Sequence, residues 1–219
     1  MRFRAIPFFL LACLLGKAAV LDRIAIVVGA GEGVRPSIVK DSDIDRDIRL
    51  TSFLNGEPLD LSAAARKKAA NRLIDQVFIR REIELGDYPA ATVEQADQQL
   101  AKLEKQKFRT TAALQEGLRR YGLTEADLRF YFEWQLTILR FIDLRFRPAV
   151  LVTDDDIAKY YQERQAALSR AHLGKSSLDD LSEEIRDILT GERVNQQFFA
   201  WLDQQRKASK IQFHEESLG

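Results

Sequence analysis

Residues 124–147 read TEADLRFYFEWQLTILRFIDLRFR, and this stretch decides the fold class. Thr124 and Asp127 are spaced to cap the start of a helix, and Pro148 marks its end. A helix that is apolar on several sides is usually buried between partners, so we predict a central core helix. The alternative is that one face stays open as a binding groove. One face holds Leu128, Phe132, Leu139, Ile142 and Phe146, and a second face holds Phe130, Trp134, Ile138 and Phe141.

Further helices are predicted on both sides of this central segment from capping residues that precede apolar stripes. Thr92 and Gln95 form a capping box, in which each side chain accepts from the other residue's backbone amide. A short helix is expected over about 112–121, and residues 169–177 are expected to be irregular. The other predicted helices begin at Ser42, Ser62 and Thr153, and a long final helix includes Leu181 to Leu202.

Strands are predicted only near the two ends of the chain. Residues 21–28, LDRIAIVV, are short and rich in β-branched side chains, and Gly29 ends them. Residues 34–39 form the returning strand of a hairpin, where Pro36 restricts it to a sheet edge. Residues 210–214, KIQFH, alternate like a terminal strand. The sequence therefore predicts a mainly α protein with a small β element.

Composition narrows the classes of function. The 219 residues are 46% hydrophobic and 30% charged with zero net charge, so nothing indicates a nucleic-acid partner. Cys13 is the only cysteine, which excludes disulfide scaffolds and thiolate zinc sites. His172 and His214 lie too far apart in sequence for a local metal motif.

Two other motifs fail as sites of chemistry. Gly29, Gly31 and Gly33 lack the spacing and the following helix of a dinucleotide fingerprint. The acidic run of residues 154–156 fits a helix N-terminus, whose dipole favours negative charge. We therefore predict no catalytic, cofactor-binding or metal-binding residue.

The first residues predict export. Arg2 and Arg4 precede an apolar run over residues 5–15, and small residues follow to Ala19. This is the pattern of a secretory signal peptide over residues 1–19, and the run is too short to span a membrane. Cleavage would leave a net charge of −3 and no cysteine. The alternative is a lipobox at residues 10–13, with a lipid anchor on Cys13.

A series of segments is found along the chain, in this order: residues 21–28, 42–45, 72–76, 121–124, 152–157, 160–161 and 198–211. Together they resemble SurA-like periplasmic chaperones, of the SurA N-terminal domain family. No single motif is specific, but their order is, and the resemblance covers most of residues 20–168 and 178–214. In the family, a parvulin isomerase domain follows the helix that carries Tyr160 and Tyr161, whereas only residues 169–177 stand there in this chain.

The resemblance implies a SurA/trigger-factor-like helical chaperone domain over residues 20–219. This domain has core helices over residues 20–168, a linker over 169–177, and a closing helix and strand over 178–219. The resemblance also implies that the last strand pairs with the first. The implied function is ATP-independent binding of unfolded exported or outer-membrane proteins in the periplasm, without catalysis. The alternatives are a peptidyl-prolyl isomerase relative that retains activity and a non-catalytic, periplasmic or lipid-anchored interaction subunit. The residues predicted to face the client are Phe53, Phe130, Trp134 and Phe141.

Overall fold

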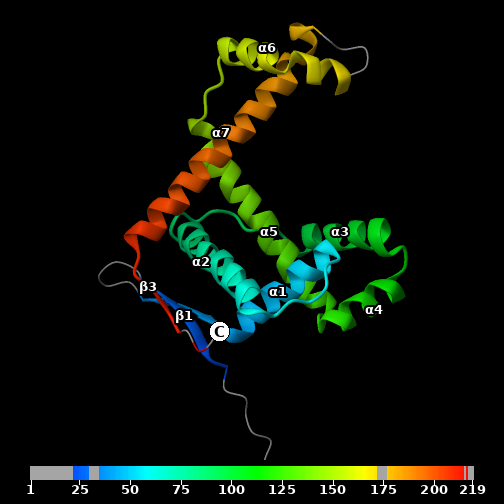
Figure 1. Cartoon of the computed structure of the whole chain (residues 1–219), viewed down its shortest axis with the longest axis vertical. Helices are drawn as coiled ribbons and strands as arrows, with labels where there is room; N and C mark the ends of the chain where they lie inside the picture. The colour runs from blue at the N-terminus through cyan, green and yellow to red at the C-terminus, as the bar shows by residue number, and fades with distance from the viewer. Residues whose placement is uncertain (1–21, 30–34, 172–176, 215, 217–219) are drawn as a thin grey trace, which may run out of the picture.

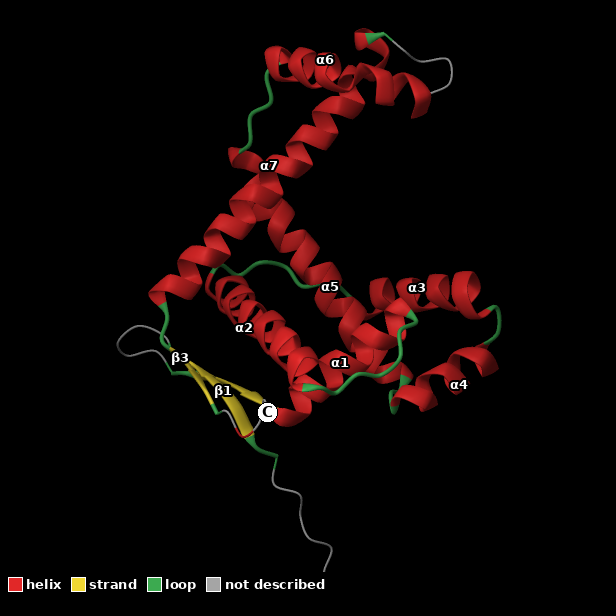
Figure 2. Cartoon of the chain, viewed as in Figure 1, coloured by secondary structure: helices red, strands yellow, loops and turns green. Residues whose placement is uncertain are grey.

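The computed structural model describes residues 22–29, 35–171, 177–214 and 216. This part of the chain is mainly helical, with one small sheet of three strands (Figure 1; Figure 2). The predicted signal peptide, including Cys13, and most of the glycine-rich segment lie outside the described residues. None of the helices that the structure describes is long and apolar enough to cross a membrane.

The sheet joins the two ends of the described chain. β1 (Ile24–Val28) lies in the centre and pairs antiparallel with both β2 (Ser37–Lys40) and β3 (Ile211–Phe213). The amide of Gly29 donates to the carbonyl of Lys210 at 2.8 Å, and a Cβ on Gly29 would lie 3.0 Å from that oxygen. Glycine therefore allows the close approach, and the predicted pairing of the last strand with the first is confirmed.

Most predicted helix starts are confirmed. The side chain of Ser62 caps α2 (Ala63–Leu85), and Thr92 with Gln95 forms the predicted capping box of α3 (Val93–Leu103). Thr124 and Asp127 do the same for α5 (Glu125–Phe146). Each of these caps depends on residues three positions apart, so local sequence is sufficient to specify them. The remaining long helices are α6 (Asp154–Ala171) and α7 (Leu178–Ala208).

The start of α1 (Asp41–Asn55) differs from the prediction. β2 runs directly into this helix, so the capping position falls on Lys40, whose backbone amide donates to Asp43 at 3.0 Å. Ser42 lies inside the first turn instead of capping it. Its hydroxyl donates to Asp22 at 2.6 Å and ties the helix to the residues before β1. The predicted cap at Ser42 is wrong because the strand leaves no free turn before the helix.

Two further connections depart from the expected pattern. α3 continues into one turn of π-helix, Glu104–Phe108, which ends at Arg109 with a φ of 66° before α4 (Thr111–Tyr121). α6 continues to Ala171, so the irregular segment predicted for residues 169–177 is wrong for residues 169–171. Residues 172–176 of that segment lie outside the described residues. A single 3₁₀ turn, Arg147–Ala149, follows α5.

The buried apolar side chains form three clusters. The main cluster lies between the sheet, α1, α2 and the C-terminal halves of α5 and α7. A second cluster joins α1 to α3, α4 and the N-terminal half of α5. A third, smaller cluster joins α6 to the N-terminal half of α7. In Figure 1, α6 and this half of α7 project away from the sheet as an arm.

α5 connects the main and second clusters, as the prediction of a central helix requires. Leu128 contributes to the second cluster, and Phe141 and Phe146 to the main one. Between these anchors the helix is not covered all round, since 59% of Phe130 and 62% of Leu139 are exposed. The predicted core helix is therefore correct. Phe130 and Leu139 lie on opposite sides of it, so single positions on both sides are exposed, and the alternative of one face open for binding stays a prediction.

Candidate functional site

The site is a groove beside the sheet, enclosed by β2, α1, α2 and α5. We call it the β2 groove, and its volume is about 280 Å³. α1 and α2 each contribute both apolar and polar side chains, including one arginine each, and α5 contributes aromatic rings. The lining residues are Ile38, Val39, Asp43, Arg46, Asp47, Leu50, Leu73, Gln76, Val77, Arg80, Phe130, Tyr131 and Trp134.

Phe130 and Trp134 form an aromatic ridge along one side of the groove. They lie four residues apart on α5 and therefore share a helix face. The indole Nε1 of Trp134 donates to Gln76 at 3.0 Å, and the Arg80 guanidinium lies 4.2 Å from the Trp134 ring centroid. Trp134 is thus held from two sides by α2, whereas Phe130 remains mostly exposed. A second hollow, of about 190 Å³, shares three of its lining residues with the β2 groove: Arg80, Phe130 and Trp134.

The residues that line the groove include a partly buried carboxylate, that of Asp47. Nε of Arg72 donates to Asp47 at 3.0 Å, and a second guanidinium nitrogen contacts the same carboxylate oxygen. Burial raises the pKa of Asp47 above its ordinary value, and the hydrogen bonds from Arg72 oppose this rise. Burial, and then the charge of Asp47, also raise the pKa of Tyr131. The groove is therefore lined both by the apolar ridge of Phe130 and Trp134 and by hydrogen-bonding groups, those of Asp47 and Tyr131.

Of the four residues predicted to face the client, two line the β2 groove and two are buried in the core. Phe130 and Trp134 line the β2 groove. Phe141 is fully buried, with ring centroids of Tyr88 and Trp201 at 5.1 and 5.8 Å. Its choice as a client-facing residue is therefore corrected, because it lies at the centre of the main cluster.

Phe53 is also a core residue, with only 4% of its surface exposed. Its ring stacks on Phe108 at 5.4 Å and meets the edge of Tyr121 at 5.7 Å. Gly117 gives these rings room, since a Cβ there would lie 3.0 Å from Phe108 and 3.2 Å from Phe53. The prediction that Phe53 faces a client is corrected for the same reason as that for Phe141.

Sequence reasoning missed most of the groove. Tyr131 could have been found, because it lies three residues before Trp134 on one helix and shares its side of the helix. Ile38, Asp47 and Arg80 come from β2, α1 and α2. No local pattern shows that these three elements meet, because their contact depends on the tertiary packing.

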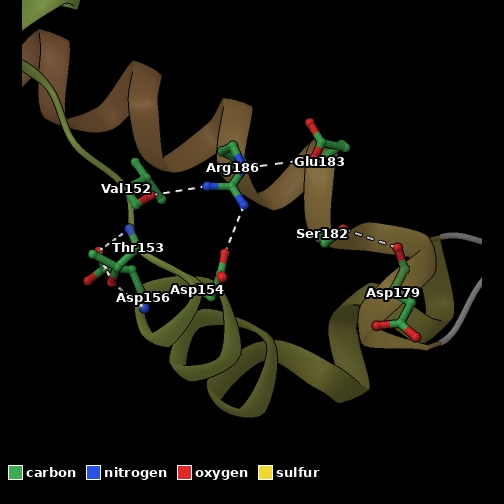
Figure 3. Close-up of polar contacts among 8 residues, drawn as sticks. All are labelled: Val152, Thr153, Asp154, Asp156, Asp179, Ser182, Glu183 and Arg186. Carbon is green, nitrogen blue, oxygen red and sulfur yellow. Dashed lines mark hydrogen bonds and ion pairs between the residues drawn. The ribbon is translucent and has the colours of Figure 1, made fainter.

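The acidic run at the start of α6 forms polar contacts with α7, and Figure 3 shows those of Arg186 with Val152 and Asp154. Asp156 accepts from the backbone amide of Thr153 at 2.9 Å and forms an ion pair with Arg193 at 2.7 Å. The hydrogen bond from Arg193 is the largest of the effects that hold the pKa of Asp156 well below its ordinary value. Arg186 donates to the carbonyl of Val152 and to Asp154, both at 3.0 Å. These contacts attach the start of α6 to α7.

Other candidates for chemistry remain isolated. Among the residues that the structure describes, no three histidine, cysteine, aspartate or glutamate side chains are grouped to hold a metal ion. His214 is exposed and its backbone amide donates to Ala25 at 2.9 Å, while His172 lies outside the described residues. The β2 groove is therefore the site with the most developed geometry.

No protein-family model matches the chain, and no curated protein matches it.

Proposed function

We propose that this protein is an ATP-independent chaperone that holds unfolded polypeptides at the β2 groove. The observation that carries the proposal is the aromatic ridge of Phe130 and Trp134, which borders two adjoining hollows. Phe130 is 59% exposed and lines the groove together with Trp134, Leu73 and Val77, and apolar surface gathered at a hollow is the kind of surface that binds apolar partners. Aromatic side chains provide much contact area at little cost in conformational entropy.

The class that we propose is SurA-like, acting in the periplasm on exported or outer-membrane proteins. The pairing of β3 with β1 supports this class, because it brings the two ends of the chain into one sheet as the resemblance implies. α6 and α7 are separated by residues 172–177 alone, far fewer than the roughly 100 residues of a typical domain. We therefore propose client binding without an isomerase domain.

The test is light scattering of a denatured outer-membrane protein diluted into buffer with the chain and without nucleotide. Phe130→Ser is the informative variant, because it removes the exposed ring of the ridge. Phe199→Ser is the matched control, since Phe199 is 64% exposed on α7 and does not line the β2 groove. We expect the wild type and Phe199→Ser to suppress aggregation at about one chain per molecule of denatured protein. Phe130→Ser should need a higher ratio of chain to denatured protein for the same suppression.

Two results would count against the proposal. If the wild type does not suppress scattering at several-fold excess, the protein is not a general chaperone. If Phe130→Ser and Phe199→Ser suppress scattering equally well, clients bind elsewhere and the β2 groove is not the site.

A further inference from the structure

β2 is an edge strand with one side unpaired. The order of the sheet is β2-β1-β3, so within the described residues no strand pairs with the outer side of β2. An edge strand presents part of its backbone amides and carbonyls to this outer side, where they can pair with another extended chain. The amide of Lys40 is occupied by Asp43, and Ser37 and Val39 lie opposite Val28 and Ile26 of β1. Because the Gly29 amide donates to β3, Val28 and Ile26 face β2, so the backbone of Ile38 is what faces the outer side.

The β2 groove is lined by two consecutive residues of β2, Ile38 and Val39. Ile38 and Val39 are consecutive residues, so their side chains point to opposite faces of the sheet. Ile38 is 50% exposed and Val39 is buried, as this alternation requires. Both residues nevertheless line the same groove. A groove that touches both faces of one strand passes its edge, and β1 occupies the other edge.

The groove also suits alternate side chains of an extended segment. Its volume of about 280 Å³ lies at the lower end of the range for ligand pockets, roughly 300–1,000 Å³, and is large enough to hold side chains of a bound segment. Leu73 and Val77 of α2 and the Phe130 ring form its apolar surfaces. In an extended segment lying beside β2, every second side chain would point toward the helices.

We propose that the outer edge of β2 accepts an extended segment of an unfolded client as a fourth strand, with alternate side chains in the β2 groove. This inference rests on the proposed function and specifies how the client binds. Backbone pairing is independent of sequence, and the groove adds a preference for apolar residues at alternate positions. Strands of outer-membrane barrels have this alternation. The short edge makes few hydrogen bonds, which suits reversible holding.

The test uses a short fluorescent peptide that alternates valine and threonine, and two versions of it with N-methyl groups on alternate residues. The two versions carry the methyl groups in opposite phase, so only one of them blocks the amides that face β2. Because both retain all side chains, binding measured by fluorescence anisotropy reports on the backbone. We expect one version to bind roughly tenfold or more weakly and the other to bind like the parent peptide.

The position of the bound peptide is then tested by measuring the affinity of the parent peptide for Phe130→Ala and for Phe199→Ala. We expect weaker binding to Phe130→Ala alone, because only Phe130 lines the groove. If both methylated versions bind alike while Phe130→Ala still weakens the parent, strand addition is wrong and the proposed function stands. If the parent peptide does not bind but the chain still suppresses client aggregation, strand addition is wrong and the proposed chaperone function still stands. If neither activity is seen, both proposals fail.

Discussion

Truncation of Phe141 and of Phe130 on the same helix should have opposite consequences for stability and for client binding. Phe141 is fully buried among Tyr88, Phe146 and Trp201, with centroid separations of 5.1, 5.8 and 5.8 Å. Removal of a buried phenylalanine side chain leaves a cavity and lowers the free energy of unfolding by about 3–5 kcal/mol. Phe130 is 59% exposed, so its truncation should change that free energy by about 0.5 kcal/mol or less.

The assay is urea denaturation of Phe141→Ala and Phe130→Ala followed by circular dichroism, with client binding measured in buffer where both variants are folded. We expect Phe141→Ala to lower the denaturation midpoint strongly and to leave client affinity unchanged. We expect Phe130→Ala to do the reverse. Equal losses of stability would show that the two positions are equally packed and would refute the division of α5 into a core part and a groove part.

Three further outcomes follow from individual positions. Burial raises the folded-state pKa of Asp47, so its protonation stabilises the fold below the unfolded pKa of about 3.9, and this stability is lost as pH rises through the folded pKa. Asp47→Asn cannot ionise at this position and should not lose stability in this way. In urea titrations, the free energy of unfolding of Asp47→Asn minus that of the wild type should therefore increase as pH rises through the folded pKa. If that difference stays constant with pH, the pKa of Asp47 is not raised. Gly29→Ala should destabilise the β1–β3 pairing, because its Cβ would lie 3.0 Å from the Lys210 carbonyl oxygen, and faster amide exchange in β3 would report it. Gly191→Ala should stabilise the protein by about 0.5–1 kcal/mol, since the added Cβ meets no atom within 4 Å in a helix interior; an unchanged melting temperature would contradict this.

Features that depend on neighbouring residues in sequence were predictable. The caps at Ser62, Thr92 and Thr124 each use a side chain and an amide three positions away, and all three are present. The start of α1 was not predictable in the same way. Ser42 is a good capping residue by type, but the path of β2 moves the helix start to Asp41 and gives the Ser42 hydroxyl to Asp22.

The groove shows the same limit at the level of packing. Phe130 and Phe141 lie about three turns apart on α5, so helical periodicity places them on nearly the same face. One is mostly exposed and the other fully buried. The difference comes from partners outside α5, since Tyr88, and Trp201 of α7, cover Phe141 and neither lines the groove beside Phe130. Sequence periodicity can identify the apolar face of a helix, but it cannot show where a partner from a distant segment covers that face.

The closure of the chain and the proposed binding edge are consequences of the same sheet. β1 has two sides, and β3 occupies one of them, so the hairpin strand β2 becomes an outer strand next to α1 and α2. Arg206 fixes the end of α7 by donating to Asp75 at 2.6 Å and to the Asn71 carbonyl at 2.7 Å, which holds α7 and the sheet against α2. A groove built on elements held in this way needs little ordering when a client binds, so even a short edge can contribute useful affinity. Loosening the Arg206 contacts should therefore weaken client binding although Arg206 does not line the groove.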